Sequence, residues 1–489
     1  MEYYELLTSE TLVIAALAAT LWLRTRNVSI MLGIGVLYYW SLYGAWSLVD
    51  DMLGGSSGRL YGYLEAKMFA INLDGYYFET LVYYGLFIVV VELTLLFLAR
   101  PGSPPRTLGQ PLYLSHLCIL LFAASAGFLS YLLIRPYLGE ALQLGLSGYK
   151  ATRDSSPYFS IHQVLNRAAL IIVALGFATR CSGEKPRLLE GDRHPWTLPA
   201  YLVVIAGLYG FNFVLGNKNE PLNAGLAGGL LYLYNRRRPR LLPVAVTATA
   251  GMCGLWLIDH FRAYPLSQIT GQFRNLDFSS LLGDSYGLVN SSNECFAAHF
   301  SLYGVLAYHI TPVLGRSFVS LAASMVPHLL WKSRPADIYT YYVSSVGAVG
   351  GQGYTIHHAT GWYLNFGAAG VPLGALVLGS AWSACLNAHR NRMRAASRWG
   401  LAFRSLAPCL FAAFLPNMVR AGIEGYKSLL LEGLLIPITV LAMAGWRMKK
   451  LTPRAAAARL APGSDGHGLT HRPAPGRSTL GQRPGLQTP

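Results

Sequence analysis

The sequence contains few charged residues for its length. Only 13% of its 489 residues are Asp, Glu, Lys or Arg, whereas a soluble globular chain carries about 25%. The hydrophobic fraction is 53%, which is too high for a chain that is mainly disordered. This composition excludes an ordinary soluble enzyme.

Several motifs of well-known chemistry are also missing. The six cysteines are scattered singly without a Cys-x-x-Cys pair, so neither a zinc knuckle nor a disulfide framework is indicated. The absence of a His-Glu-x-x-His motif and of a Walker A loop argues against a metalloenzyme and a nucleotide-driven pump. No Asp-x-Asp occurs either, which makes a metal-bound nucleotide sugar a poor candidate donor. We therefore expect no metal and no cofactor.

Long apolar runs recur along the chain, and a membrane crossing needs roughly 20 such residues. We predict an all-α integral membrane protein with about eleven transmembrane helices (range about 10–14). The predicted spans are 9–23, 29–49, 78–98, 112–134, 164–179, 197–215, 222–235, 241–258, 359–382, 401–419 and 429–446.

Basic residues in the short connections predict the orientation of these spans, because Lys and Arg accumulate on the cytoplasmic side. The connections rich in them follow the first, third, fifth and seventh spans, fill 390–404 and open the C-terminal tail. All of them lie on one side if the N-terminus is outside and the C-terminus inside. Most of the net charge of +16 is then explained by Lys and Arg on the cytoplasmic side of the membrane. It does not indicate a nucleic-acid partner.

This orientation places residues 259–358 outside, as a large external loop before the last three spans. Its weakly apolar pieces, 297–314 and 317–331, are interpreted as interfacial or re-entrant helices; the alternative is that both cross the membrane. Residues 1–450 would form one polytopic membrane domain. Residues 451–489 are rich in Pro, Gly, Arg and Ala and are predicted to be a disordered basic cytoplasmic tail.

Several Lys and Arg residues lie on the predicted outer side, although such residues accumulate on the cytoplasmic side, and their position requires an explanation. One reason is a bound anion such as a lipid-linked pyrophosphate, which Arg and Lys clamp well; the other is contact with lipid headgroups. The candidates from this set are Lys150, Arg153, Lys218, Lys332, Arg334 and Arg420.

Two other features allow a functional interpretation. His357 and His358 precede the ninth predicted span, where a histidine could accept a proton from a sugar hydroxyl or could anchor the helix. Glu92 lies inside the third span, and Arg167 lies inside the fifth. Ionisable groups in a span are costly and often functional, which keeps a proton-coupled transporter as an alternative.

Four segments resemble bacterial oligosaccharide repeat-unit polymerases, the Wzy-type O-antigen and exopolysaccharide polymerases. Residues 326–335 (VPHLLWKSRP) resemble the family's "Pro-Arg-x-Leu-Trp-Pro-x-Lys-Pro", and 360–371 (TGWYLNFGAAGV) resemble "Glu-x-Tyr-x-Asn-Phe-Gly-x-x-Gly". Residues 215–218 (LGNK) are similar to an outer "Gly-Ser/Asn-Arg-Gly" turn, and 419–422 (VRAG) to an "Arg-Gly" opening the last external turn. Gly361 and Lys218 stand where the family has an acidic residue and an arginine.

The resemblance implies a glycosyltransferase at the outer face of the bacterial inner membrane. It would polymerise undecaprenyl-pyrophosphate-linked repeat units without metal, because the sugar–phosphate bond is already activated. Membrane lipid, a chain-length regulator and a flippase are the partners it implies. An O-antigen ligase, which uses the same donor, and a polysaccharide flippase or transporter are the alternatives.

The transfer that the resemblance implies needs a base and a counter-charge for the departing pyrophosphate, and residues on the predicted outer side close to a span are the candidates. His357 or His358 would serve as the base, and Arg420 would stabilise the departing pyrophosphate. Substrate would also contact Lys218, Arg153, Lys150, Arg334, Lys332, Tyr363 and Asn365.

Overall fold

The computed structural model describes twelve longer stretches of the chain and isolated residues between them. They are 2–54, 72–101, 112–139, 156–182, 188–192, 194–217, 219–236, 264–274, 294–326, 337–347, 355–391 and 397–451. Residues up to Met448 form one compact unit. All but Leu451 of the predicted tail, 451–489, lies outside the described residues.

Nine helical segments in this part of the chain are long and apolar enough to cross a membrane. Helices α1 (Glu2–Thr25), α5 (Gly75–Leu98), α9 (Phe159–Cys181), α10 (Thr197–Val214) and α20 (Arg398–Arg420) each make one. Four further segments combine neighbouring elements and cover Val28–Trp46, His116–Tyr137, His358–Arg390 and Gly422–Gly445. The chain is therefore a multi-pass helical membrane protein.

These nine segments coincide with nine of the predicted spans. The predicted span 222–235 belongs to α11 (Asn219–Asn235), a helix of 17 residues. The predicted span 241–258 lies largely outside the described residues. The total number of spans and their orientation stay predictions.

Several helices begin at a side chain that satisfies their first free N–H groups. Asn27 caps α2 (Val28–Tyr38), Asp74 caps α5, Ser115 caps α6 (His116–Ile134), and Ser397 caps α20. Asp74 accepts from both Tyr76 N and Tyr77 N at 3.0 Å. Such caps stabilise a helix by roughly 0.5–2 kcal/mol, and they define where each apolar run becomes helical.

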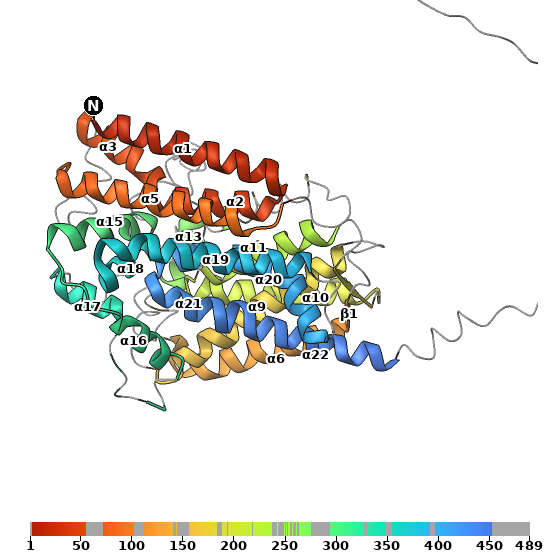
Figure 1. Ribbon diagram of the computed structural model, residues 1–489. Coiled ribbons are helices and arrows are strands. Elements are labelled where there is room, and N and C mark those ends of the chain that lie inside the picture. Colours follow the sequence, from red (N-terminus) through yellow and green to blue (C-terminus); the bar gives the residue numbers. More distant parts are fainter. Residues whose placement is uncertain are drawn as a thin grey trace, which may run out of the picture. The chain divides into compact units, whose positions relative to one another are not determined.

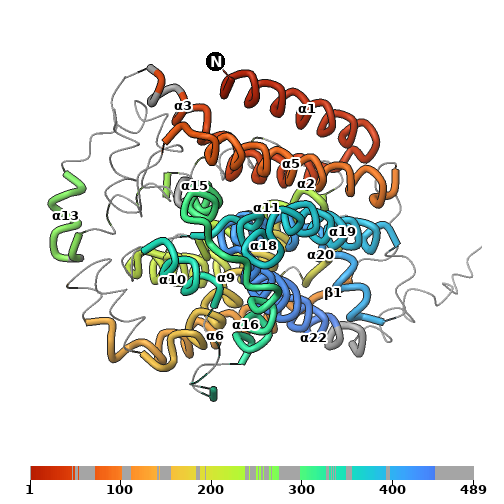
Figure 2. The backbone as a smooth tube through the Cα atoms, turned by 60° about the vertical axis from the view of Figure 1, so that its left-hand side comes forward, coloured from red at the N-terminus to blue at the C-terminus, as the bar shows by residue number. Residues whose placement is uncertain are grey.

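Helices α1 and α5 lie on one side of this unit and α6 on the other, with α19 (Gly370–Arg390) and α20 between them (Figures 1 and 2). In the most apolar window of α20, 83% of the residues are buried, against 17% in α1. Exposed apolar side chains such as Leu12, Phe97 and Phe128 lie on the outer helices. Helix α20 is thus the centre of the packing, while the outer helices present apolar surface suited to lipid.

The ninth predicted span is interrupted. Helix α18 (His358–Phe366) ends at Gly367, whose φ of +64° favours glycine, and η4 (Gly367–Ala369) leads into α19. A Cβ on Gly370 would lie 2.1 Å from Trp362 O. The glycines thus allow the chain to turn and to pack closely at this break.

Short helices occupy much of the described part of the predicted external loop. They are α13 (Leu266–Arg274), α15 (Glu294–Ala307), α16 (Arg316–Ser324) and α17 (Ile338–Ser345). Helices α15 and α16 have 14 and 9 residues, fewer than the roughly 20 that a crossing needs. Their place relative to the membrane stays a prediction.

Three features differ from a purely α-helical expectation. Strands β1 (Leu112–Leu114) and β2 (Leu189–Gly191) form a short parallel pair, which Asn235 supports by accepting from Leu188 N and Leu189 N. The predicted span 112–134 accordingly becomes helical only at His116. Two π-helices also occur. The first, η1 (Tyr39–Tyr43), lies between α2 and helix α3 (Gly44–Gly54). The second, η7 (Ser428–Leu435), precedes α22 (Ile436–Leu451).

Candidate functional site

Two segments that are distant in sequence meet at the start of α18. Ile356 N donates to Arg420 O at 3.2 Å, and Gly422 N donates to Ile356 O at 2.8 Å. This short parallel bridge joins Ile356 to Ala421. Both predicted catalytic histidines are thereby held next to the end of α20, which carries Arg420.

His358 connects α18 to the turn that follows Arg420. Its Nδ1 donates to Gly422 O at 2.8 Å, because a carbonyl oxygen can only accept. Its Nε2 then accepts from Trp362 Nε1 and lies 3.1 Å from Tyr426 Oη. The imidazole is fully buried, and both of its nitrogens are engaged within the protein.

His357 is the N-cap of α18. Its Nδ1 accepts from Ala359 N at 3.1 Å, so its Nε2 carries the proton and donates to Ser41 Oγ at 3.0 Å. Burial, with smaller effects of His358 and His299, holds the pKa of His357 well below its usual range. These contacts favour the anchoring interpretation of both histidines over the interpretation as a base.

His299 of α15 extends this buried polar group toward the N-terminal helices. Its Nδ1 donates to Ser41 O at 2.7 Å, and its Nε2 lies 2.9 Å from Tyr77 Oη. Tyr84 Oη donates to His299 O at 2.6 Å. The contacts fix α15 against α5 and the π-helix η1, so Ser41 links His299 to His357.

Asn365 is also engaged in the interior. Its Oδ1 accepts from Ser317 Oγ, and its Nδ2 donates to Gly361 O, both at 2.7 Å. The side chain is fully buried, so it ties α16 to α18 and its position does not suit the predicted direct contact with substrate. Tyr363 is half-buried, with its ring 5.5 Å edge-on from that of Tyr83.

The packing explains why Gly361 occupies the position where the resembled family has an acidic residue. A Cβ here would lie 2.9 Å from Ile423 N and 3.0 Å from Gly422 Cα. These are backbone atoms, which cannot swing aside as a flexible side chain can. The close approach of α18 to the turn at 422–423 therefore requires glycine.

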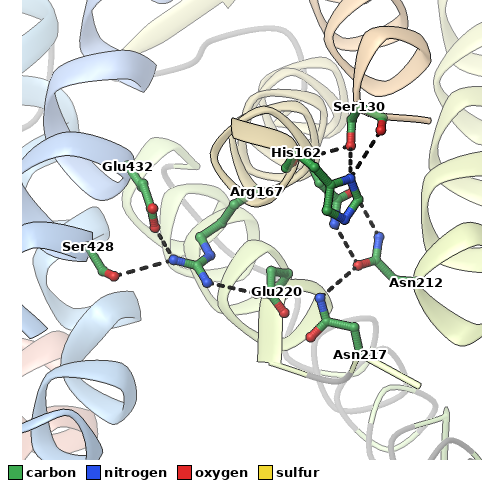
Figure 3. A network of polar contacts seen from close by, with 9 residues as sticks. Ser130, His162, Arg167, Asn212, Asn217, Glu220, Ser428 and Glu432 are labelled. Atoms are coloured by element: carbon green, nitrogen blue, oxygen red, sulfur yellow. Dashed lines mark hydrogen bonds and ion pairs between the residues drawn. The ribbon is translucent and has the colours of Figure 1, made fainter. Parts of the chain in front are cut away.

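A buried ion cluster lies between α9, α11 and η7 (Figure 3). Arg167 of α9 donates to Glu220 of α11 at 2.7 Å. The same guanidinium contacts the carboxylate of Glu432 and lies 3.3 Å from Ser428 Oγ, both in η7. The two carboxylates are 3% and 4% exposed, and charges buried this deeply persist only when they are paired.

A network of amides continues from this cluster, as Figure 3 shows. Asn166 and Asn212 exchange two hydrogen bonds of 2.8 and 3.1 Å, and Asn217 donates to Asn212 at 3.3 Å. Next to them His162 Nδ1 lies 2.8 Å from Ser130 Oγ. Asn217 belongs to the turn between α10 and α11, where Gly216 has a φ of +65°.

Arg420 ends α20 beside this cluster and is partly exposed. Its charge interacts favourably with Glu220 and unfavourably with Arg167. Arg420 thus places a cation at the end of α20, next to the buried carboxylate of Glu220. Within the described residues, no group of three or more His, Cys, Asp or Glu side chains could hold a metal ion.

Comparisons with protein-family models, with curated proteins and with solved structures found no match.

The structure brings together some of the residues predicted from sequence. His357, His358 and Arg420 lie around one backbone bridge, and Tyr363 and Asn365 lie on the same short helix α18. The other predicted substrate contacts, namely Lys150, Arg153, Lys218, Lys332 and Arg334, lie outside the described residues.

The sequence interpretation missed the partners of Arg167. Glu432 lies within a predicted span, and a carboxylate in an apolar run is a signal of function or of a buried partner. Glu220 lies in a segment predicted to be a short external turn, where a carboxylate is common and does not indicate a function. Only the packing of α11 and η7 against α9 shows that both carboxylates contact Arg167.

Proposed function

We propose that the chain is a glycosyltransferase of the outer face of the bacterial inner membrane. It polymerises oligosaccharide repeat units carried on undecaprenyl pyrophosphate into O-antigen or exopolysaccharide. The growing glycan leaves its lipid carrier and is transferred to a sugar hydroxyl of the incoming unit.

The position of Arg420 carries this proposal. Residues 419–422 and 360–371, which resemble two of the family's motifs, are joined through the bridge at Ile356 and through His358. Glu220, two residues after the third such segment, is a charged neighbour of Arg420. Two segments with this resemblance are therefore joined where α20 ends at Arg420, and the third ends two residues before a charged neighbour of Arg420.

The chemistry of the transfer matches this arrangement. Breaking the bond between the sugar and the pyrophosphate leaves negative charge on the phosphate oxygens. Preorganised cationic donors stabilise such charge in the transition state, and a guanidinium can do so with two parallel hydrogen bonds. Arg420 takes this role, while His357 and His358 hold the backbone on which it is mounted.

Arg420→Ala tests the proposal. We expect a strain with this variant to make single-repeat products in place of long chains, because the departing pyrophosphate loses its counter-charge. Arg420→Lys keeps the charge but not the planar fork, and we expect intermediate chain length. The measurement is a chain-length gel of surface polysaccharide, with the membrane content of each variant checked by immunoblot.

Arg135, an exposed residue of η2 (Arg135–Tyr137), provides the matched control. It also lies on the predicted outer side, and Arg135→Ala should leave chain length unchanged. Normal chain length in the Arg420→Ala strain would remove Arg420 from the site.

The buried ion cluster favours a second candidate function, transport, since paired charges within spans also line ion and substrate pathways.

A deletion strain separates the candidates. Single-repeat surface products indicate a lost polymerase, and accumulated lipid-linked polymer indicates a lost ligase. Repeat units retained on the cytoplasmic side indicate a lost flippase.

A further inference from the structure

One carboxylate oxygen of Glu220 has no hydrogen-bond partner among the described residues. Oε1 accepts from Arg167 at 2.7 Å, whereas Oε2 is buried and has no hydrogen-bond partner among the described residues. The residue is only 3% exposed. A buried acceptor left in this way is costly, and it calls for a specific explanation such as water, an ion or a ligand.

Two buried donors on the residues that flank Glu220, its ion-pair partner and the residue one helical turn later, are also unmatched within the described part of the chain. They are Nε of Arg167 and Nδ2 of Asn223. Asn223 is 1% exposed and follows Glu220 by three residues on α11, which places both on the same face of the helix. Two donors and one acceptor complement a hydroxyl group, which accepts two hydrogen bonds and donates one.

We propose that Glu220 is the catalytic base of the transfer, that it binds the acceptor sugar hydroxyl through Oε2, and that Arg167 positions its carboxylate. This inference rests on the proposed function, because it assigns the acceptor to a site next to Arg420.

The step balances as follows. The acceptor hydroxyl oxygen forms a bond to the anomeric carbon, and its proton passes to Oε2 of Glu220. The bond between that carbon and the phosphate oxygen breaks, and its electron pair leaves with undecaprenyl pyrophosphate, next to Arg420. The protonated Glu220 then returns its proton to water.

The contacts favour Glu220 over the other bases nearby. Both nitrogens of His357 and of His358 are engaged with protein groups. Glu432 also contacts Arg167, but it belongs to η7 and not to α11, which carries Asn223. Among these groups, Glu220 is the one that contacts Arg167, has an oxygen without a hydrogen-bond partner and is a charged neighbour of Arg420.

The test uses the full chain in lipid nanodiscs with an undecaprenyl-pyrophosphate-linked repeat unit as both donor and acceptor. Glu220→Gln keeps the shape but cannot accept the proton, and we expect the polymerisation rate to fall by about 100-fold or more, the typical contribution of a general base. Glu220→Asp should retain part of the activity. Glu432→Gln, which alters the same ion cluster, should lose less than about tenfold.

Glu92→Gln supplies the control for loss of a buried carboxylate, because Glu92 is 0% exposed on α5 and lies outside this cluster. Its activity should equal that of the wild type. The thermal unfolding midpoint of each variant shows whether it is folded.

The outcomes distinguish the two proposals. If the wild type forms no polymer from the lipid-linked unit, the proposed function is wrong. If the wild type polymerises and Glu220→Gln does so at the same rate, or Glu432→Gln loses equally much, Glu220 is not the base.

Discussion

At the scale of single residues, the histidines show how little a residue type says about its role. His299, His357 and His358 come from a region predicted to lie outside the membrane, yet all three are buried and hydrogen-bonded. A histidine near a membrane surface can serve as a base or as an anchor. The partners of its two nitrogens decide between these roles, and those partners lie on other helices.

The burial of His299 predicts a dependence of stability on pH. Burial lowers the pKa of His299 to about 4, whereas an unfolded histidine titrates near ~6.5. Between these values the unfolded chain binds a proton that the folded protein does not. Stability should therefore be constant above about pH 6.5 and decrease as the pH falls toward 4; His357, whose pKa is also lowered by burial, acts in the same direction.

Thermal unfolding in detergent between pH 7.5 and about 4.5 measures this effect. His299→Gln should reduce the slope of the unfolding midpoint with pH, while His194→Gln, at an exposed position, should leave it unchanged. An equal slope in the wild type and in His299→Gln would contradict the assignment.

At the scale of elements, the apolar runs locate the helices but not their interruptions. The run 359–382 predicts one continuous span, whereas the chain breaks after Phe366 into α18 and α19. Gly361, Gly367 and Gly370 lie at or near this break. Their function follows from the backbone groups that pack against them, which the sequence does not reveal.

Gly361→Ala tests the close approach of α18 to the turn after Arg420. The new Cβ would lie 2.9 Å from Ile423 N, and overpacking of this kind typically costs about 1–3 kcal/mol. We expect a lower unfolding midpoint and shorter glycan chains, because the bridge that holds Arg420 is displaced.

Gly210→Ala in α10 is the matched control, since a Cβ there meets no atom within 4 Å. Alanine has the higher helix propensity, so this variant should be neutral or more stable by up to about 1 kcal/mol. Equal midpoints for Gly361→Ala and the wild type would show that the approach is looser than the structure indicates.

At the scale of the whole molecule, the described helices establish a multi-pass membrane protein. The orientation rests on the placement of Lys and Arg in the connections, which predicts an external N-terminus and a cytoplasmic C-terminus. In this predicted orientation Arg420 and the Glu220 cluster would lie toward the outer side, as the proposed transfer from a flipped lipid-linked donor requires.

Reporter fusions test this orientation. Alkaline phosphatase, which is active only in the periplasm, should be active when fused within 264–274 and inactive after Lys450. A fluorescent protein that folds only in the cytoplasm should give the opposite result at these two positions. Reversed activities would place Arg420 on the cytoplasmic side and would exclude transfer from a flipped donor.

The sequence by itself determined the helical membrane class and most positions of the described spans. These properties are local, because the length of an apolar run depends on neighbouring residues alone. Only the tertiary structure decided that Ile356 pairs with Ala421, that Arg167 contacts Glu220 and Glu432, and that His357 and His358 are anchored. These contacts join residues distant in sequence, and packing of helices against one another sets which of them meet.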